Sequence, residues 1–162
     1  QALDETRAAL EELLTASRLG GRAGRMLADR SQFRGRTMDG DLAAYIDFLI
    51  DESGMRLGVC DWGYCAYRAE SAACRGDEHG PNPTWRTEST CVRCANFAVT
   101  ERHRPVWEAR RSRNLSLLSN SRLDPVSLAL ARTRIAECDR ILAELTGDSH
   151  AAPEPAGAAD PL

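Results

Sequence analysis

Apolar residues recur at helical spacing in three segments near the start of the chain. In the first, residues 2–18, the leucines lie on one helical face and the first turns are acidic, which the helix dipole favours. Similar spacing predicts a short basic helix over 22–33 and a third helix over 41–53. The apolar stripe of this third helix comprises Leu42, Tyr45, Ile46, Leu49 and Ile50. We therefore expect residues 1–54 to form an N-terminal helical region.

Helical spacing returns near Pro105, a residue suited to a first turn, and continues to about Leu118. Asp124-Pro125 then predicts a new helix, capped by the aspartate, that runs to about Leu145 before Gly147. A heptad seam follows its apolar residues, Leu128, Ala131, Ile135, Cys138, Leu142 and Leu145. Because the link between the two helices is short, we expect residues 101–146 to form an antiparallel helical hairpin.

Residues 55–100, between the two helical regions, show no such periodicity. They hold five of the six cysteines together with several glycines and prolines, which favours loops and a short β-hairpin. So few apolar residues cannot form a core without a covalent or metal tie. The Ala/Pro-rich segment 147–162 is expected to be disordered. The predicted fold is therefore mostly α, with helices on both sides of a small irregular or β-hairpin zinc knuckle.

The cysteine spacing points to a metal. Thiolates bind Zn²⁺ tetrahedrally, and a C-x2-C turn such as Cys91 to Cys94 presents two sulfurs to one ion. The other two ligands must come from upstream, where Cys65 and Cys74 are the best pair. Cys60 competes for one of these places, and His79 is a further substitute. Four sulfurs leave no position for water, so the predicted zinc is structural.

Three other roles compete with metal binding for these cysteines. Disulfides are disfavoured in a chain that we place in the cytoplasm, because its acidic, amphipathic N-terminus is not a signal peptide. A redox C-x2-C pair usually opens a helix after a strand, a context that the sequence does not offer. A plain buried cysteine is the expected role of Cys138, in the heptad seam.

The charge pattern suggests a second kind of site. The net charge is −3, yet lysine is absent and all 21 basic residues are arginines. They cluster near residues 18–36 and 102–113, with an acidic block between the clusters. Such clusters provide a basic face for phosphates or, alternatively, an exposed salt-bridged helix surface. The arginines expected to contact DNA phosphates are Arg86, Arg93, Arg102, Arg104, Arg110, Arg111 and Arg113.

Other features narrow the choice of function. No apolar run approaches the roughly 18 residues of a membrane span, so no membrane partner is expected. Tyr45 is a conceivable nucleophile, but its place in an apolar stripe favours packing. His103 is a phosphate contact, a surface residue or a helix-start contact. No nucleophile with an acid/base pair is visible. The chain begins at Gln1, which favours a fragment of a longer protein.

One region resembles a known family. The run Gly63-Tyr64-Cys65, followed by Cys74 and then by Cys91-x2-Cys94-x2-Phe97, is similar to the C-terminal cysteine-rich tail of large site-specific integrases of the tyrosine recombinase family, carried by transposons and integrative elements. The resemblance covers roughly residues 55–145 and includes the charged segment that follows Phe97. The family's His-x-x-Arg is missing, and the loop from Ser71 to Pro83 is longer than the family leads us to expect.

The resemblance implies a non-catalytic module of a site-specific integrase that acts in DNA integration or recombination. DNA is the expected partner through phosphate contacts. The heptad helix is expected to pair with a catalytic recombinase domain or with a second copy of the chain. Trp85, Trp107 and Phe97 are candidates for stacking on bases, although packing around the metal is the favoured role of each. The alternative function is a zinc-stabilised protein-interaction module without a nucleic-acid role.

Overall fold

The computed structural model of the chain describes residues 2–16, 18–30, 46–52 and 56–147. Within them the protein is mostly helical with one small antiparallel sheet, which confirms the predicted class at that level. The main helices are α1 (Ala2–Thr15), α2 (Gly21–Arg30), α4 (Glu88–Val92), α5 (Arg104–Leu118) and α6 (Pro125–Thr146). The strands are β1 (Arg56–Cys60), β2 (Gly63–Tyr67) and β3 (Phe97–Ala98). Short helical turns cover Phe48–Glu52 (η2), Ala69–Ser71 (η3) and Glu101–His103 (η4).

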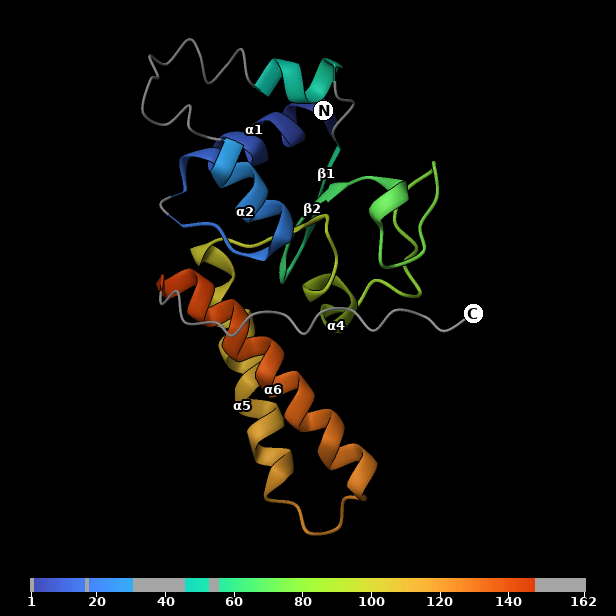
Figure 1. Cartoon of the computed structure of the whole chain (residues 1–162), viewed down its shortest axis with the longest axis vertical. Helices are drawn as coiled ribbons and strands as arrows, with labels where there is room; N and C mark the ends of the chain where they lie inside the picture. Colours follow the sequence, from blue (N-terminus) through green and yellow to red (C-terminus); the bar gives the residue numbers. More distant parts are fainter. Residues whose placement is uncertain (1, 17, 31–45, 53–55, 148–162) are drawn as a thin grey trace.

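The sheet has β2 in its centre, with β1 and β3 antiparallel to it on either side. Residues paired directly across strands share a face, so Leu57 and Ala66 point the same way, as do Tyr64 and Ala98. These side chains form one core with the buried leucines of α1 and with Leu27 of α2. The two N-terminal helices therefore cover this face of the sheet (Figure 1).

The link between α1 and α2 differs from the prediction of a helix to residue 18. Helix α1 ends at Thr15 because the chain turns to pair Gly20 with Val99, through reciprocal N–H···O bonds of 2.9 and 3.0 Å. Gly21 then opens α2 with φ of +77°, and a Cβ at that position would lie 2.5 Å from the carbonyl oxygen of Phe97. Only glycine fits this close crossing without a backbone shift.

Part of the predicted N-terminal region lies outside the described residues. This includes residues 31–45, with Tyr45 and the first part of the third helix predicted over 41–53; residues 46–52 are helical, with η2 as a π-turn. The tail predicted over 147–162 also lies outside, apart from Gly147. In the part of the chain that is described, no helix combines the length and the apolar character needed to span a membrane.

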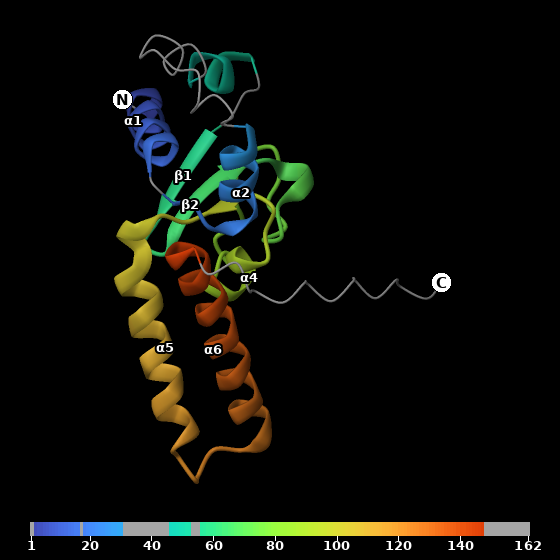
Figure 2. The same ribbon diagram turned by 60° about the vertical axis from the view of Figure 1, so that its left-hand side comes forward.

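The predicted helical hairpin is confirmed. Helices α5 and α6 pack along each other and project away from the sheet and the N-terminal helices (Figures 1 and 2). Asp124 caps α6 by accepting a 2.7 Å hydrogen bond from the Ser127 N–H, and Gly147 ends it with φ of +78°. At the base of the hairpin a second core contains Trp107, Cys138, Ile141 and Leu145 together with Phe97 and Val99. Cys138 is fully buried, as its seam position predicts.

His103 starts the hairpin as a structural residue. Its Nδ1 accepts a 3.0 Å hydrogen bond from the Thr100 N–H, which completes a capping box. Its ring packs edge-on against the Tyr64 ring, with 5.0 Å between the two ring centres. Burial, aided by the charge of Arg102, lowers the pKa of His103 from 6.5 to about 4. The imidazole is therefore neutral and internal at neutral pH, which removes it from the candidates for phosphate contact.

This buried histidine predicts acid sensitivity. Because the folded pKa lies below the unfolded one, the unfolded state binds more protons between pH 6.5 and 4. Stability is complete above pH 6.5 and falls as the pH drops towards 4, by up to about 3 kcal/mol from this group. This loss of unfolding free energy can be measured by urea unfolding of the wild type and of His103→Gln at pH 7, 5.5 and 4.5. The glutamine keeps a capping-box acceptor but does not titrate. Equal pH slopes in the two proteins would contradict the prediction.

Candidate functional site

The thiols of Cys60 and Cys65 lie on the face of the sheet that α1 and α2 leave free. Cys65 pairs with Gly58 on one side and with Phe97 on the other, and Cys60 pairs with Gly63. Since the strand period is two, these residues point away from the Tyr64 face. The β-hairpin thus presents both sulfurs towards α4 and the loop that precedes it.

Helix α4 brings the second pair of cysteines to this region. Thr87 caps it, Cys91 lies in its last turn, and the chain then folds back so that the Cys94 N–H donates to the Cys91 carbonyl at 2.9 Å. The Cys94 sulfur accepts amide N–H bonds from Ala73 and Asn96, each at 3.5 Å. The segment that carries Cys74 therefore lies directly against Cys94.

The thiols are close enough to influence one another's ionisation. Burial raises the pKa of Cys65 to about 12, with further increases from Cys94, Cys91 and Cys60. Burial likewise raises the pKa of Cys91 to about 11, aided by Cys60 and Cys94. Cys74 lies near the same group of thiols. The pKa of the Tyr67 hydroxyl is raised first by burial and then by Cys74, with smaller increases from Cys65 and Cys94. Because burial raises their pKa values, Cys65 and Cys91 are poor nucleophiles at neutral pH, which disfavours a redox role for the Cys91-x2-Cys94 pair.

Two buried nitrogen groups face these sulfurs without a conventional partner. The Nε and Nη2 atoms of Arg86 and the Nε1 atom of Trp62 are buried and have no partner at full hydrogen-bonding distance and angle among the described residues. Burial raises the pKa of Cys60 and of Cys91, whereas hydrogen bonding by Arg86 lowers the first and hydrogen bonding by Trp62 lowers the second. Both side chains nevertheless act on the thiols. Arg86 opposes the effect of burial on the pKa values of Cys60, Cys65 and Cys91, and Trp62 opposes it on Cys91. Buried donors of this kind call for electron-rich acceptors, such as thiolates.

The predicted zinc remains a prediction. All six cysteines are free thiols, so no disulfide links them. Among the described residues, no three His, Cys, Asp or Glu side chains are arranged so that they could hold a metal ion as they stand. His79, the suggested substitute ligand, is on the surface beside Asp77 with its side chain 82% exposed.

The arginines predicted to contact DNA fall into three groups. Arg102 pairs with Glu12, Arg104 with Glu101, and Arg111 with Asp139, all by exposed ion pairs. Arg93 and Arg113 are exposed and have no acidic partner within the described ranges. Arg86 faces the cysteines, and Arg110 is only 6% exposed. The sequence could not distinguish these groups, because ion-pair partners such as Glu12 and Asp139 are distant along the chain.

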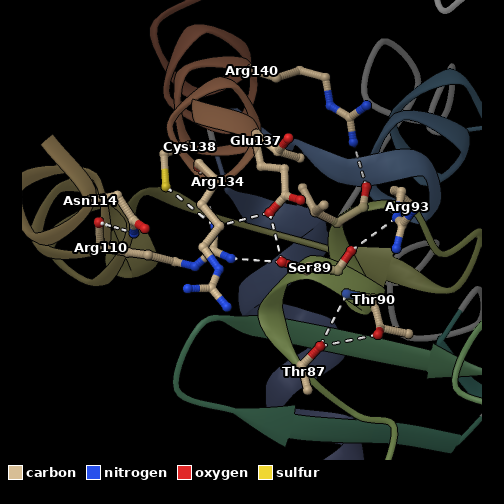
Figure 3. Close-up of polar contacts among 12 residues, drawn as sticks. Thr87, Ser89, Thr90, Arg93, Arg110, Asn114, Arg134, Glu137, Cys138 and Arg140 are labelled. Carbon is tan, nitrogen blue, oxygen red and sulfur yellow. Dashed lines mark hydrogen bonds and ion pairs between the residues drawn. The ribbon is translucent and has the colours of Figure 1, made fainter. Parts of the chain in front are cut away.

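Arg110 is instead the centre of a buried network that joins α4 to the helical hairpin (Figure 3). Its guanidinium meets the Glu137 carboxylate at 3.0 Å and donates to the Ser89 hydroxyl at 2.8 Å. Ser89 in turn donates to Glu137 at 3.0 Å, and a weaker contact of 3.6 Å reaches the sulfur of Cys138. Arg110 is therefore unavailable to a phosphate, which corrects the role that the sequence suggested for it.

A surface hollow lies next to the cysteines, and only two of its lining residues, Trp85 and Arg93, were named from the sequence. About 400 Å³ in volume, it is lined by Ala73, Arg75, Trp85, Thr90 and Arg93. Trp85 is 53% exposed, whereas Trp107 and Phe97 are buried in the second core. Exposure thus singles out Trp85 among the aromatic residues weighed for stacking. Arg75 was missed, because nothing in the sequence indicates that it lies over Trp85.

Comparison of the chain with protein-family models, with characterised proteins and with solved structures gives no match. The resemblance to recombinase tails is therefore still a prediction.

The Arg110–Glu137 pair provides a test of how α4 is joined to the helical hairpin. Arg110→Met leaves a buried carboxylate without its cation, and we expect it to cost about 3–5 kcal/mol of unfolding free energy. The double variant Arg110→Met/Glu137→Met removes both charges and should recover most of that loss. Denaturant unfolding measures both, with Arg111→Met, which breaks an exposed pair on the same helix, as a control expected to cost below about 1 kcal/mol. A double variant as unstable as the sum of the two single variants would contradict this account.

Proposed function

We propose that the chain is a non-catalytic, zinc-tied module that contacts DNA during integration or recombination, as part of a cytoplasmic site-specific integrase of the tyrosine recombinase type. One observation carries the proposal of a metal tie: buried and half-buried thiols are close enough to raise one another's pKa, and buried N–H donors of Arg86 and Trp62 face them. The resemblance to recombinase tails supplies the setting in DNA integration.

Zinc would satisfy groups that the protein alone leaves unsatisfied. Bound thiolates are electron-rich and carry net negative charge, so the guanidinium of Arg86 would balance charge and the indole of Trp62 would donate to a ligand sulfur. The amide N–H groups of Ala73 and Asn96 already point at the Cys94 sulfur. Binding requires the thiols to lose their protons and draw together. The ion would supply a structural tie, with no part in catalysis.

The proposed ligands are Cys65, Cys74, Cys91 and Cys94. Cys60 is the competitor. Its thiol donates to the Gly63 carbonyl at 3.1 Å, as the Cys94 thiol does to the Ser71 carbonyl at 3.7 Å, so hydrogen bonding alone does not choose between the candidates. Cys74 is adjacent in sequence to Ala73, whose N–H donates to the Cys94 sulfur at 3.5 Å, and this supports its place among the proposed ligands.

The ligand assignment predicts the metal content of matched cysteine variants. Elemental analysis of the purified full chain should find about one zinc per chain, as one tetrahedral site requires. Cys74→Ser should lose the zinc, whereas Cys60→Ser should keep it. Cys138→Ser, in the hairpin core, is the control for general destabilisation and should also keep its metal.

The reverse pattern, with zinc lost from Cys60→Ser and kept by Cys74→Ser, would contradict the assignment of Cys74 as a ligand in place of Cys60. A metal-free wild-type protein, purified without chelator and supplied with zinc, would contradict the proposed tie itself.

The DNA contact rests on the arginines that remain available. Arg93 and Arg113 are exposed and have no acidic partner in the part of the chain described, and the exposed pairs of Arg102, Arg104 and Arg111 are of the weak kind that a phosphate can replace. Arginine binds phosphate through two parallel N–H bonds, which position a duplex without reading its sequence. Arg86 and Arg110 are not part of this proposal.

A salt titration tests the DNA contact. Fluorescence anisotropy of a labelled duplex should show affinity falling steeply as salt rises from about 50 to 200 mM, because phosphate contacts release counterions. Arg93→Gln/Arg113→Gln should weaken binding to every sequence and reduce the slope of log K against log salt by about 2. Arg7→Gln is the matched control, since Arg7 pairs with Asp47 beside α1, and its slope should be unchanged. Absence of binding even at 50 mM salt would contradict the DNA role.

The second candidate is a protein-interaction module with the same zinc tie. It is favoured by apolar side chains that the hairpin exposes, Leu115, Leu117, Val126 and Leu130. Such residues suit docking to a catalytic domain or to a second copy of the chain. Two results together would select this alternative. The sedimentation coefficient would depend on protein concentration, and the chain would fail to bind DNA at low salt.

A further inference from the structure

The hollow beside the cysteine segment has a composition that the metal tie does not explain. It combines an exposed tryptophan with two arginines, Arg75 and Arg93, in a space of about 400 Å³. We propose that this hollow binds one unpaired nucleotide of a DNA strand. The base would stack on Trp85, and the adjoining phosphates would meet Arg75 and Arg93. The inference deepens the proposed DNA contact and rests on it.

Trp85 is held in a fixed position by its backbone. Its N–H donates to the Asn82 carbonyl at 3.2 Å, and its own carbonyl accepts from the Thr87 N–H at 3.1 Å. Thr87 is also the cap of α4, whose last turn carries Cys91. The ring is thus presented at the surface by a turn that leads directly into the helix of the proposed metal site. A rigid aromatic ring loses little conformational freedom when a base stacks on it.

Arg75 is directed at the same ring. Its guanidinium carbon lies 5.5 Å from the centre of the Trp85 ring, in a cation–π contact. Its φ of +55° is the only positive φ among the non-glycine residues that the structure describes. A bulky residue rarely adopts this left-handed conformation, and such outliers gather at binding sites. The Arg75 N–H donates to Ala72 at 3.1 Å, which fixes the turn.

Arg93 supplies a second oriented cation. Its Nε donates to the Ser89 carbonyl at 3.2 Å, which anchors the side chain and leaves the terminal nitrogens for a ligand (Figure 3). No carboxylate among the described residues pairs with Arg75 or Arg93. By contrast, Arg104 and Arg111 both have acidic partners. The hollow is therefore a place where positive charge remains available for an anion.

The combination favours an unpaired nucleotide over other anionic ligands. An aromatic side chain can reach the π-face of a base only where that base is not stacked inside a duplex. An acidic peptide would use the two cations but would leave the tryptophan face without a planar partner. A volume of about 400 Å³ lies within the range of small-ligand pockets.

The test compares single-stranded with duplex DNA on the full chain, supplied with zinc. Anisotropy with a labelled ten-residue oligothymidylate should show about tenfold weaker binding for Trp85→Leu and near-normal binding for Trp85→Phe, because one base–aromatic stack is lost and then restored. Arg75→Gln and Arg93→Gln should each lower the salt slope by about 1. Because Trp85 is exposed, its variants should unfold at the wild-type denaturant midpoint, which serves as the folding control.

Tryptophan fluorescence gives an independent readout. Binding should quench the emission and protect it from acrylamide, and both changes should vanish in Trp85→Leu, since Trp107 is buried and the partly buried Trp62 packs against the second core. Wild-type affinity for the single strand in a folded Trp85→Leu would overturn the nucleotide site while leaving duplex binding intact. An acidic peptide that displaces the strand at equal concentration would also overturn it. Failure of both DNA forms to bind at low salt would instead reject the proposed DNA contact.

Discussion

The cysteine-containing segment, residues 56–100, has few apolar residues and lies between two hydrophobic cores. The positions of its cysteine thiols are the constraint on which the rest of the structure depends. Cys65 lies on the central strand of the sheet, whose other face carries the first core with α1 and α2. Cys91 and Cys94 belong to the second core, with Trp107 and α6. A tie between these cysteines therefore joins the two cores through the knuckle. This geometry is the physical reason to expect a metal where hydrophobic packing is thin.

The knuckle is also joined to the hairpin by polar contacts that do not need a metal. Arg110 and Glu137 form a nearly buried pair with Ser89 of α4, and Arg140 donates to the Val92 carbonyl. The Trp107 indole donates to Trp62 in the β1–β2 turn at 2.9 Å. The hairpin is thus oriented relative to the sheet by side chains of α5 and α6. Of the arginines that the sequence assigned to DNA, Arg110 serves this structural role, and Arg102, Arg104 and Arg111 form ion pairs at the surface.

Features with local causes were predictable from the sequence. The Asp124-Pro125 start and the Gly147 end of α6 depend on neighbouring residues, and both are confirmed. Burial of Cys138 followed from the helical period. The pairing of Gly20 with Val99, which shortens α1, joins segments about eighty residues apart and leaves no local signal. The same distance effect explains why Arg86 and Arg110 were assigned to DNA and why Arg75 was overlooked. For the candidate site, the four cysteine ligands named from the sequence remain a prediction, and the strand register was needed to show that Cys60 and Cys65 share a face.

The central claim is that four cysteine sulfurs hold one zinc ion and join the two cores. X-ray absorption at the zinc edge of the purified full chain tests it most directly, because it reports the ligand atoms and their distances. We predict a single shell of four sulfurs at about 2.3 Å, unchanged in Cys60→Ser. A shell containing nitrogen or oxygen ligands at about 2.0 Å, or a chain without stoichiometric zinc, would contradict the account.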